Sequence, residues 1–315
     1  MGSSPITRSN SILGKTMNII FPSLPGTKQV CPFWEKEAKA AEAAGFGISL
    51  AKDFNDSGPV FVTNKTDSYL YRGWIVKPPY YQEMCQVAGG TVVTSQENYL
   101  WTFNFPEWYN VLGSIHTPKS FTFTADEVVA LGLTAIAEEI GKQTGSQSLI
   151  LKDWLKSRKH EWFEACFIKD ATDTADVIRV MCNFFNLQGR DFYGGLVFRR
   201  FLELKKLGIH PKSGMPLPIE FRTFFINQEP LVTSMYWNND IPYPEGVELP
   251  PQDWLVEIGK KMKASFVALD IAQDVDGKWW VIEVNDGGTA GYPDNLDSHE
   301  FYRLLANGLG QVQSS

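Results

Sequence analysis

The sequence ALDIAQDVDGKWWVIEVND, residues 268–286, is the most informative part of the chain. It predicts two β-strands joined by a turn at Asp276-Gly277, because an Asp-Gly pair between hydrophobic runs is a strong hairpin signal. Side chains alternate between the two faces of a strand, so Glu283 and Asn285, two residues apart, point to the same face. Pairing with the first strand can bring Asp270 onto this face as well. We therefore expect three oxygen-bearing side chains to converge on one surface of a sheet.

These three side chains form a candidate metal site. The flanking residues Leu269, Ile271, Ile282 and Val284 are all apolar. Burying carboxylates together without a partner costs several kcal/mol, and a bound cation is the usual remedy. A purely oxygen ligand set favours magnesium, which binds through one or two carboxylates plus substrate phosphates. The alternative is a solvated hairpin face without a ligand.

The spacing of these residues resembles a known family. Asp270, then Glu283 thirteen residues later and Asn285 two further on, is similar to the metal-binding hairpin of the ATP-grasp superfamily. A lysine strand in SLILKDWLKSRKHEW (148–162), a hinge strand and an E-F-R hairpin in IEFRTFFINQEPLVTSMYW (219–237) precede it in the family's order. The lysine strand and the E-F-R hairpin resemble the clade named for one arginine and two lysines. The E-F-R hairpin is also similar to that of the eukaryotic ATP-grasp chaperone that assembles a translation-initiation factor.

The resemblance spans roughly residues 121 to 302 and implies a fold and a site. The expected fold is an α/β N-terminal domain followed by an α+β ATP-grasp module of two subdomains with the nucleotide between them. In this family the Asp, Glu and Asn hold magnesium ions that bridge the phosphates of ATP. The resemblance therefore implies ATP and Mg²⁺ as cofactors, with Asp270, Glu283 and Asn285 as metal ligands.

Positive charges are expected opposite the metal. Lys152 leaves the apolar run LIL, and a lysine at the end of a buried strand needs a compensating anion. The resemblance assigns Lys152 to the α-phosphate side of the nucleotide. Lys156 and Arg158 are candidates for the other phosphates, and Lys159 belongs to the same cluster. The alternative for this cluster is a solvated basic turn.

The resemblance implies that Arg222 stabilises the transferring γ-phosphate or an acyl-phosphate intermediate, a role that suits a forked guanidinium. With Lys152 and Lys156 it forms the predicted catalytic set. The alternative is a structural Glu220–Arg222 pair at a sheet edge. Several ligases of the family have an arginine two residues before the metal Asp, where this chain has Ala268.

The segment LVFRRFLEL (196–204) resembles the hinge strand. Backbone groups around Arg200, Phe201 and Leu202 are expected at the adenine edge, and Glu203 at the ribose hydroxyls, although an apolar strand of this kind is also ordinary core. The glycine-containing segment from Asp286 to Gly291 is expected either to face the acceptor substrate or to be a simple surface turn.

Length and composition fit this organisation. The 315 residues predict about two domains, and 43% hydrophobic content is ample for their cores. A net charge of −7 argues against bulk binding to nucleic acid or anionic membranes. Four scattered cysteines indicate reduced thiols and a cytoplasmic protein. We expect a leader or expression remnant at 1–16, an N-terminal domain at 17–117 and an ATP-grasp domain at 118–315, divided into 118–197 and 198–315.

The implied activity is that of a carboxylate–amine ligase. ATP would activate a small-molecule or peptide carboxylate as an acyl phosphate, and an amine would then displace phosphate to form an amide or peptide bond. Two alternatives remain open: an ATP-binding assembly chaperone that holds a partner protein, and a small-molecule phosphotransferase.

Overall fold

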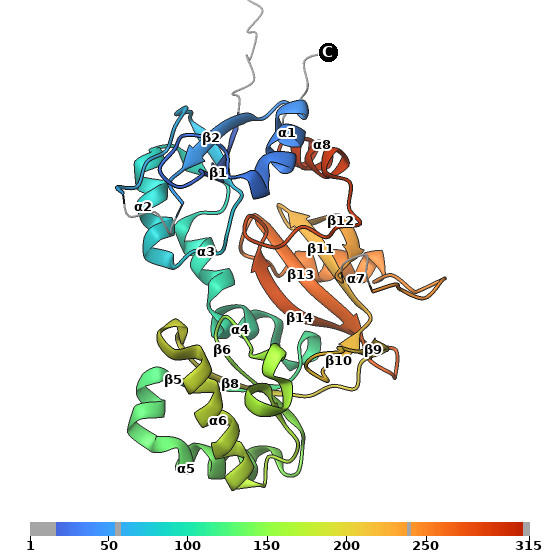
Figure 1. The fold of residues 1–315 in the computed structure, drawn as a ribbon. Coiled ribbons are helices and arrows are strands. Elements are labelled where there is room, and N and C mark those ends of the chain that lie inside the picture. Colours follow the sequence, from blue (N-terminus) through green and yellow to red (C-terminus); the bar gives the residue numbers. More distant parts are fainter. Residues whose placement is uncertain (1–16, 54–57, 238–240, 311–315) are drawn as a thin grey trace, which may run out of the picture. The chain divides into compact units, whose positions relative to one another are not determined.

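The structure is a computed structural model that describes residues 17–53, 58–237 and 241–310. The leader expected at 1–16 lies outside the described residues. The chain forms two compact units, which are coloured by sequence in Figure 1: the first comprises Met1–Gly73, Gln82–Val93 and Ser298–Ser315, and the second Trp74–Tyr81 and Thr94–Asp297. The domain limits predicted at 17–117 and 118–315 stay a prediction.

A parallel four-stranded sheet in the order β2-β1-β3-β4 forms the centre of the first unit. Its strands are β1 (Asn18–Pro22), β2 (Gly47–Ala51), β3 (Ser68–Tyr71) and β4 (Thr91–Val92). All five residues of β1 are buried, as expected for a central strand of a parallel sheet that is covered on both faces. The segment YRGWIV (71–76) contributes only Tyr71 to the sheet, since β3 begins at Ser68 and ends at Tyr71.

A buried polar triad connects the first and the last helix of the first unit. The helices are α1 (Glu35–Ala43), α8 (Ser298–Gly308) and part of α2 (Pro78–Ala88). α1 packs against the C-terminal α8, although the two are far apart in the sequence (Figure 1). Arg72 donates hydrogen bonds of 2.7 and 3.2 Å to Glu37, and the Tyr302 hydroxyl donates one of 2.7 Å to the same carboxylate. The triad thus connects the segment after β3, the first helix and the last helix.

The second unit begins with two helices, α3 (Gln96–Phe103) and α4 (Phe105–His116). The proline-containing aromatic stretch 103–120 is therefore mostly helical. Pro106 is compatible with a helix here because it lies in the first turn of α4, where a missing N–H costs nothing. Phe105 and Trp108 of this helix are buried.

The first of two antiparallel sheets in this unit has the order β5-β8-β6-β7. Its strands are β5 (Ser120–Thr124), β6 (Leu149–Asp153), β7 (Phe167–Ile168) and β8 (Gly195–Arg200). Helices α5 (Ala125–Thr144) and α6 (Thr174–Gln188) pack with these strands in one apolar core. α5 begins at Thr124 with a capping box and ends at Gly145, where its expected stop lies.

The second antiparallel sheet has the order β12-β11-β13-β14. It contains β11 (Glu220–Ile226), β12 (Glu229–Met235), β13 (Phe266–Gln273) and β14 (Trp279–Asp286). Helix α7 (Gln252–Gly259) packs in the same apolar core as Phe221, Phe225, Leu269 and Ile271. Both predicted hairpins are present, with turns at Asn227-Gln228 and at Gly277, all three in the left-handed region. A small hairpin of β9 (Lys206–Ile209) and β10 (Pro216–Pro218), which sequence reasoning missed, precedes this sheet.

None of the helices in the described part of the chain has the length and apolar composition needed to cross a lipid bilayer.

Candidate functional site

A row of charged residues crosses the second antiparallel sheet. In the strand pairing, Arg222 of β11 lies opposite Asp270 of β13, and Asp270 lies opposite Glu283 of β14. Arg222 donates from Nε to Oδ1 of Asp270 at 2.7 Å and from Nη2 to Oδ2 at 2.8 Å. Asp270 is only 1% exposed. The predicted alternative, a Glu220–Arg222 pair at a sheet edge, is wrong, because β11 lies between two strands and Arg222 pairs with Asp270.

Glu283 is held by a lysine from the other sheet. Lys152 at the end of β6 is 4% exposed, and its Nζ lies 2.7 Å from Oε1 of Glu283. Burial opposes ionisation of Glu283, but the positive charges of Lys152, Lys159 and Arg199 outweigh it and lower the pKa of this carboxyl. The buried strand lysine thus has a carboxylate as the compensating anion that its position requires.

Asn285 completes the predicted trio of oxygen donors. Its Nδ2 lies 3.4 Å from Oδ2 of Asp270, so the three side chains do share one face of the sheet. Burial raises the pKa of Asp270, while the contact with Arg222 opposes that rise. Among the described residues, no group of three or more His, Cys, Asp and Glu side chains is arranged to hold a metal. A metal here would therefore need Asn285 as a ligand beside the two carboxylates, and this all-oxygen set is of the type that magnesium prefers.

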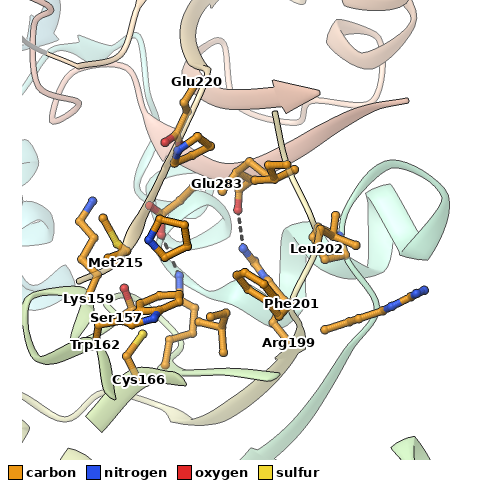
Figure 2. A pocket seen from close by; sticks show the side chains of 18 of the residues that line it. Ser157, Lys159, Trp162, Cys166, Arg199, Phe201, Leu202, Met215, Glu220 and Glu283 are labelled. Carbon is orange, nitrogen blue, oxygen red and sulfur yellow. Dashed lines mark hydrogen bonds and ion pairs between the residues drawn. The ribbon is translucent and has the colours of Figure 1, made fainter. Parts of the chain in front are cut away.

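A pocket adjoins this charged row (Figure 2). It encloses about 1020 Å³ of space, part of it open to solvent. Its polar end contains Lys152, Lys159, Glu220 and Glu283. The remaining lining is mainly apolar and aromatic and includes Trp162, Phe201, Met215, Trp237 and Ile282. An apolar slot with convergent charged groups at one end suits a ligand with a flat ring and an anionic tail.

Only one member of the basic cluster Lys156, Arg158 and Lys159 lines the pocket. Lys159 does so, and its Nζ lies 3.3 Å from the Tyr236 hydroxyl. Burial opposes its charge, but Tyr236 and nearby carboxylates raise the pKa of Lys159 overall. Lys156 is exposed, and Arg158 pairs with Glu161 at 3.1 Å; neither lines the pocket.

Of the four predicted hinge residues, three line the pocket and one does not. Arg200, Phe201 and Leu202 all line the pocket, whereas Glu203 is exposed, lies outside it and is 3.7 Å from Lys206. Glu220, to which sequence reasoning gave no binding role, is a buried carboxyl in the pocket wall. Burial, with Asp270 nearby, raises the pKa of Glu220 to about 8. Its place at the start of the E-F-R strand, two residues before Arg222, was the available signal.

The segment after β14 reaches the charged row through its backbone. The carbonyl oxygen of Gly291 accepts a hydrogen bond of 2.8 Å from Nη1 of Arg222. A Cβ atom at position 291 would lie 3.3 Å from that nitrogen, so a side chain here would crowd the contact. Asp286 is buried at the end of β14. The expectation that Asp286 to Gly291 faces an acceptor substrate stays a prediction.

Comparisons with known proteins agree with this geometry. Residues 140–305, more than half of the chain, match the model of an ATP-grasp domain family, the third family of the clade named for one arginine and two lysines. No curated protein matches the chain.

Several solved structures share the fold at low sequence identity. The D-alanine–D-alanine ligase from Coxiella burnetii has a TM-score of 0.61 and 13% identity, over 94% of this chain and 95% of that one. A RimK domain ATP-grasp protein from Sphaerobacter thermophilus has a TM-score of 0.59 and 13% identity, over 93% and 99%. The ATP-grasp ligase PsnB, complexed with a minimal precursor, Mg and ADP, has a TM-score of 0.52 and 14% identity, over 92% and 98%. Together with the family match, these observations show that the chain belongs to the ATP-grasp superfamily, in the third family of the clade named for one arginine and two lysines.

Proposed function

We propose that this chain is an ATP-dependent carboxylate–amine ligase that forms an amide or peptide bond through an acyl phosphate. The observation that supports this most is the meeting of Lys152, Arg222, Asp270, Glu283 and Asn285 beside one pocket. Membership of the ATP-grasp superfamily supports the nucleotide, and similarity in fold to ligases, among them PsnB with its bound precursor, supports the reaction class.

The charge balance of the pocket suits a polyphosphate. The pocket lining contains five cations and two carboxylates: Lys152, Lys159, Arg199, Arg200, Lys206, Glu220 and Glu283. Because the pKa of Glu220 is raised to about 8, this carboxyl is mainly neutral at pH 7, which leaves a positive excess. ATP brings about four negative charges, and magnesium bound near them would neutralise part of this charge.

Each residue then has a defined task. Lys152 is assigned to the α-phosphate side, and Lys159, rather than Lys156 or Arg158, to the phosphates beyond it. Asp270, Glu283 and Asn285 are the proposed magnesium ligands. Arg222 binds both oxygens of Asp270 and Lys152 binds Oε1 of Glu283 in this structure, so a metal would compete with these cations for the carboxylate oxygens and free one or both of them. The freed cations would then be available for phosphate oxygens.

The apolar part of the pocket is assigned to the base. Backbone groups of Arg200, Phe201 and Leu202 would contact the adenine edge, with Ile282 against the ring. We reassign the ribose hydroxyls from Glu203 to Glu220, because Glu220 lies in the pocket wall and Glu203 lies outside the pocket.

In the proposed reaction a substrate carboxylate oxygen attacks the γ-phosphorus of ATP, and the bond to the β–γ bridging oxygen breaks to release ADP. An amine then attacks the acyl carbon, phosphate leaves, and the amine loses a proton. Catalysis rests on positioning and on neutralising charge that develops in the transition state. Arg222 supplies the cation beside the metal Asp that the family arginine would supply at Ala268. No side-chain nucleophile is required.

An assay of ADP, phosphate and acyl transfer tests this proposal. The protein is incubated with Mg-ATP, pooled carboxylic acids and pooled amines, and hydroxylamine in a parallel sample traps any acyl phosphate as a hydroxamate. A ligase releases ADP and phosphate only when acid and amine are both present, and the trapped sample contains hydroxamate. Phosphate retained on a substrate would instead indicate a phosphotransferase, and tight ATP binding without turnover a chaperone.

Two variants make the assay specific. Glu283→Ala should abolish turnover, since it removes a proposed metal ligand, while Glu138→Ala on the exposed face of α5 serves as a matched control. Turnover by Glu283→Ala near the wild-type rate would contradict the proposed metal site.

A further inference from the structure

Arg199 is a buried cation that forms no ion pair among the described residues, although Glu283 lies near enough to interact with its charge. It lies on β8, is 7% exposed and lines the same pocket as Lys152 and Glu283. In the described part of the chain no carboxylate forms an ion pair with it, and its buried Nε and Nη2 have no hydrogen-bond partner. Burying an arginine in this way is costly, and burial lowers the pKa of Arg199 to about 10. A structural role elsewhere in the core would more usually come with an acidic partner.

Two kinds of contact hold the guanidinium in place. Nη1 donates a hydrogen bond of 2.5 Å to the carbonyl oxygen of Ile282 on β14 (Figure 2). The guanidinium carbon lies 5.1 Å from the centre of the Phe105 ring and 5.7 Å from that of Trp108. Cation–π contacts of this kind partly compensate for lost hydration. The side chain therefore bridges from the hinge strand to the strand that contains two of the proposed metal ligands.

The carbonyl that Arg199 binds belongs to a β-bulge. Asp270 pairs with Glu283 and Ile271 with Val281, so Ile282 lies opposite no residue of β13. In a regular strand Ile282 and Glu283 would point to opposite faces, yet both line the pocket. A bulge re-aims a side chain in this way, and bulges are frequent next to active sites. Here the bulge lets Glu283 face Lys152 and Asp270 while Ile282 forms the pocket wall.

We infer that Arg199 is a positioning residue: by binding the Ile282 carbonyl it fixes the bulge that aims Glu283, and it couples the nucleotide's hinge strand to the metal ligands. The inference rests on the proposed function, because it assigns a role toward Mg-ATP. The residues next to Arg199 on the hinge, Arg200 to Leu202, are the ones assigned to adenine. A base bound there stabilises the same strand that holds Glu283 in its metal-binding orientation.

Such coupling has a measurable form. If nucleotide and magnesium stabilise the same arrangement of β8 and β14, magnesium strengthens nucleotide binding, and nucleotide strengthens magnesium binding by the same factor. Removing Arg199 should reduce this factor, because Glu283 is then no longer held in register with Asp270. Mutating residues that orient metal ligands typically costs about 10- to 100-fold in metal affinity.

The test is the affinity for a non-hydrolysable ATP analogue with and without Mg²⁺, measured by calorimetry. The near-isosteric Arg199→Gln should lower the gain due to magnesium about tenfold. Arg199→Lys retains the charge but not the forked geometry, and it should recover part of the gain. Arg190→Gln, an exposed arginine in the turn after α6, is the matched control and should bind as the wild type does. Circular dichroism and urea unfolding establish that each variant is folded.

The outcomes separate clearly. A folded Arg199→Gln protein with the full magnesium gain would overturn the inference, even if its free energy of unfolding is reduced, because that result describes a merely structural residue. If the glutamine variant does not fold, the lysine variant decides: a smaller gain supports the inference and an unchanged gain overturns it. Wild-type protein that gains nothing from magnesium would contradict the proposed function itself, and this failure is recognised before any variant is measured.

Discussion

The two compact units each contain a buried cluster of charged residues, and the two clusters differ in how they are neutralised. In the first unit, Glu37 receives three hydrogen bonds, two from Arg72 and one from Tyr302. In the second unit, Arg222 binds Asp270 and Lys152 binds Glu283, but the Glu283 side chain is 33% exposed and two nitrogens of Arg199 have no partner. One cluster is complete in itself, whereas the other adjoins a pocket with a positive excess.

This difference indicates which cluster serves stability and which serves binding. A closed ion pair that connects α1, α8 and the residue after β3 gains nothing from a ligand, and its loss leaves an uncompensated buried charge. Charged groups that border a pocket with shifted pKa values are typical of functional sites. The following predictions test this contrast, in order of the expected size of effect.

Replacing Arg72 by Met should cause the largest loss of stability. The variant leaves Glu37 buried without its cation, which is expected to lower the free energy of unfolding by about 3–5 kcal/mol. Tyr302→Phe removes one hydrogen bond to the same carboxylate and should cost about 1.5–3 kcal/mol. Urea unfolding at pH 7 measures both. A loss below about 1 kcal/mol for Arg72→Met would remove the distinction between the clusters.

Replacing Glu283 by Gln should reduce ATP turnover strongly and stability less. Magnesium-dependent turnover of ATP should fall at least about 100-fold, because a proposed metal ligand is lost. The free energy of unfolding should fall by less than in Arg72→Met, because a third of the Glu283 side chain is exposed and the amide oxygen of glutamine still accepts a hydrogen bond from the buried Lys152. Steady-state kinetics measures the turnover of ATP, and urea unfolding measures the free energy of unfolding. A large loss of stability with unchanged turnover would indicate a second structural cluster instead.

Glu220 predicts a dependence of stability on pH. Its folded-state pKa of about 8 lies above its unfolded value near 4.3, so the folded protein retains a proton between these pH values. The wild type should therefore lose stability as pH rises through this window. Glu220→Gln does not titrate, and its free energy of unfolding relative to wild type should increase by on the order of 2 kcal/mol between pH 5 and pH 8.5.

Parallel pH profiles for Glu220→Gln and the wild type would show that Glu220 ionises in the ordinary range, and its assignment as a mainly neutral carboxyl would then be wrong.

The smallest expected effect is a difference in ATP affinity between variants of two lysines in one segment. Lys159 lines the pocket and Lys156 is exposed. Lys159→Gln should weaken ATP binding about tenfold, as expected for a lost charge-assisted contact, and Lys156→Gln at most about threefold. Equilibrium binding at two salt concentrations checks this. Equal effects of the two substitutions would contradict this difference and would indicate that both lysines contact the phosphates.

Much of the site could be predicted because it lies in regular strands. The Asp-Gly turn predicts the last hairpin, and alternation places Glu283 and Asn285 on one face, but the bulge at Ile282 is what brings Asp270 opposite Glu283. Lys152 was recognisable as a charge at the end of an apolar strand. The strand–turn pattern of both hairpins followed from the same local signals, and the ATP-grasp fold followed from the resemblance to that superfamily.

What could not be predicted depends on irregular or long-range structure. Lys156 lies in an irregular segment and Lys159 begins a short 3-10 helix, so no simple periodicity tells which side chain faces the pocket. The bulge at Ile282 has no signature in the sequence, so the contact with Arg199, eighty-three positions away, was invisible. Glu220 was interpreted only as a partner for Arg222, because nothing local shows that Asp270 takes that role.

The most direct test of the central claim is a crystal structure with a non-hydrolysable ATP analogue and magnesium. We expect the triphosphate to contact Lys152 and Lys159, with magnesium about 2.0–2.1 Å from oxygens of Asp270, Glu283 or Asn285. We also expect that Arg222 no longer holds both oxygens of Asp270. A nucleotide bound elsewhere, or bound in this pocket with both ion pairs intact and no metal beside them, would contradict the account.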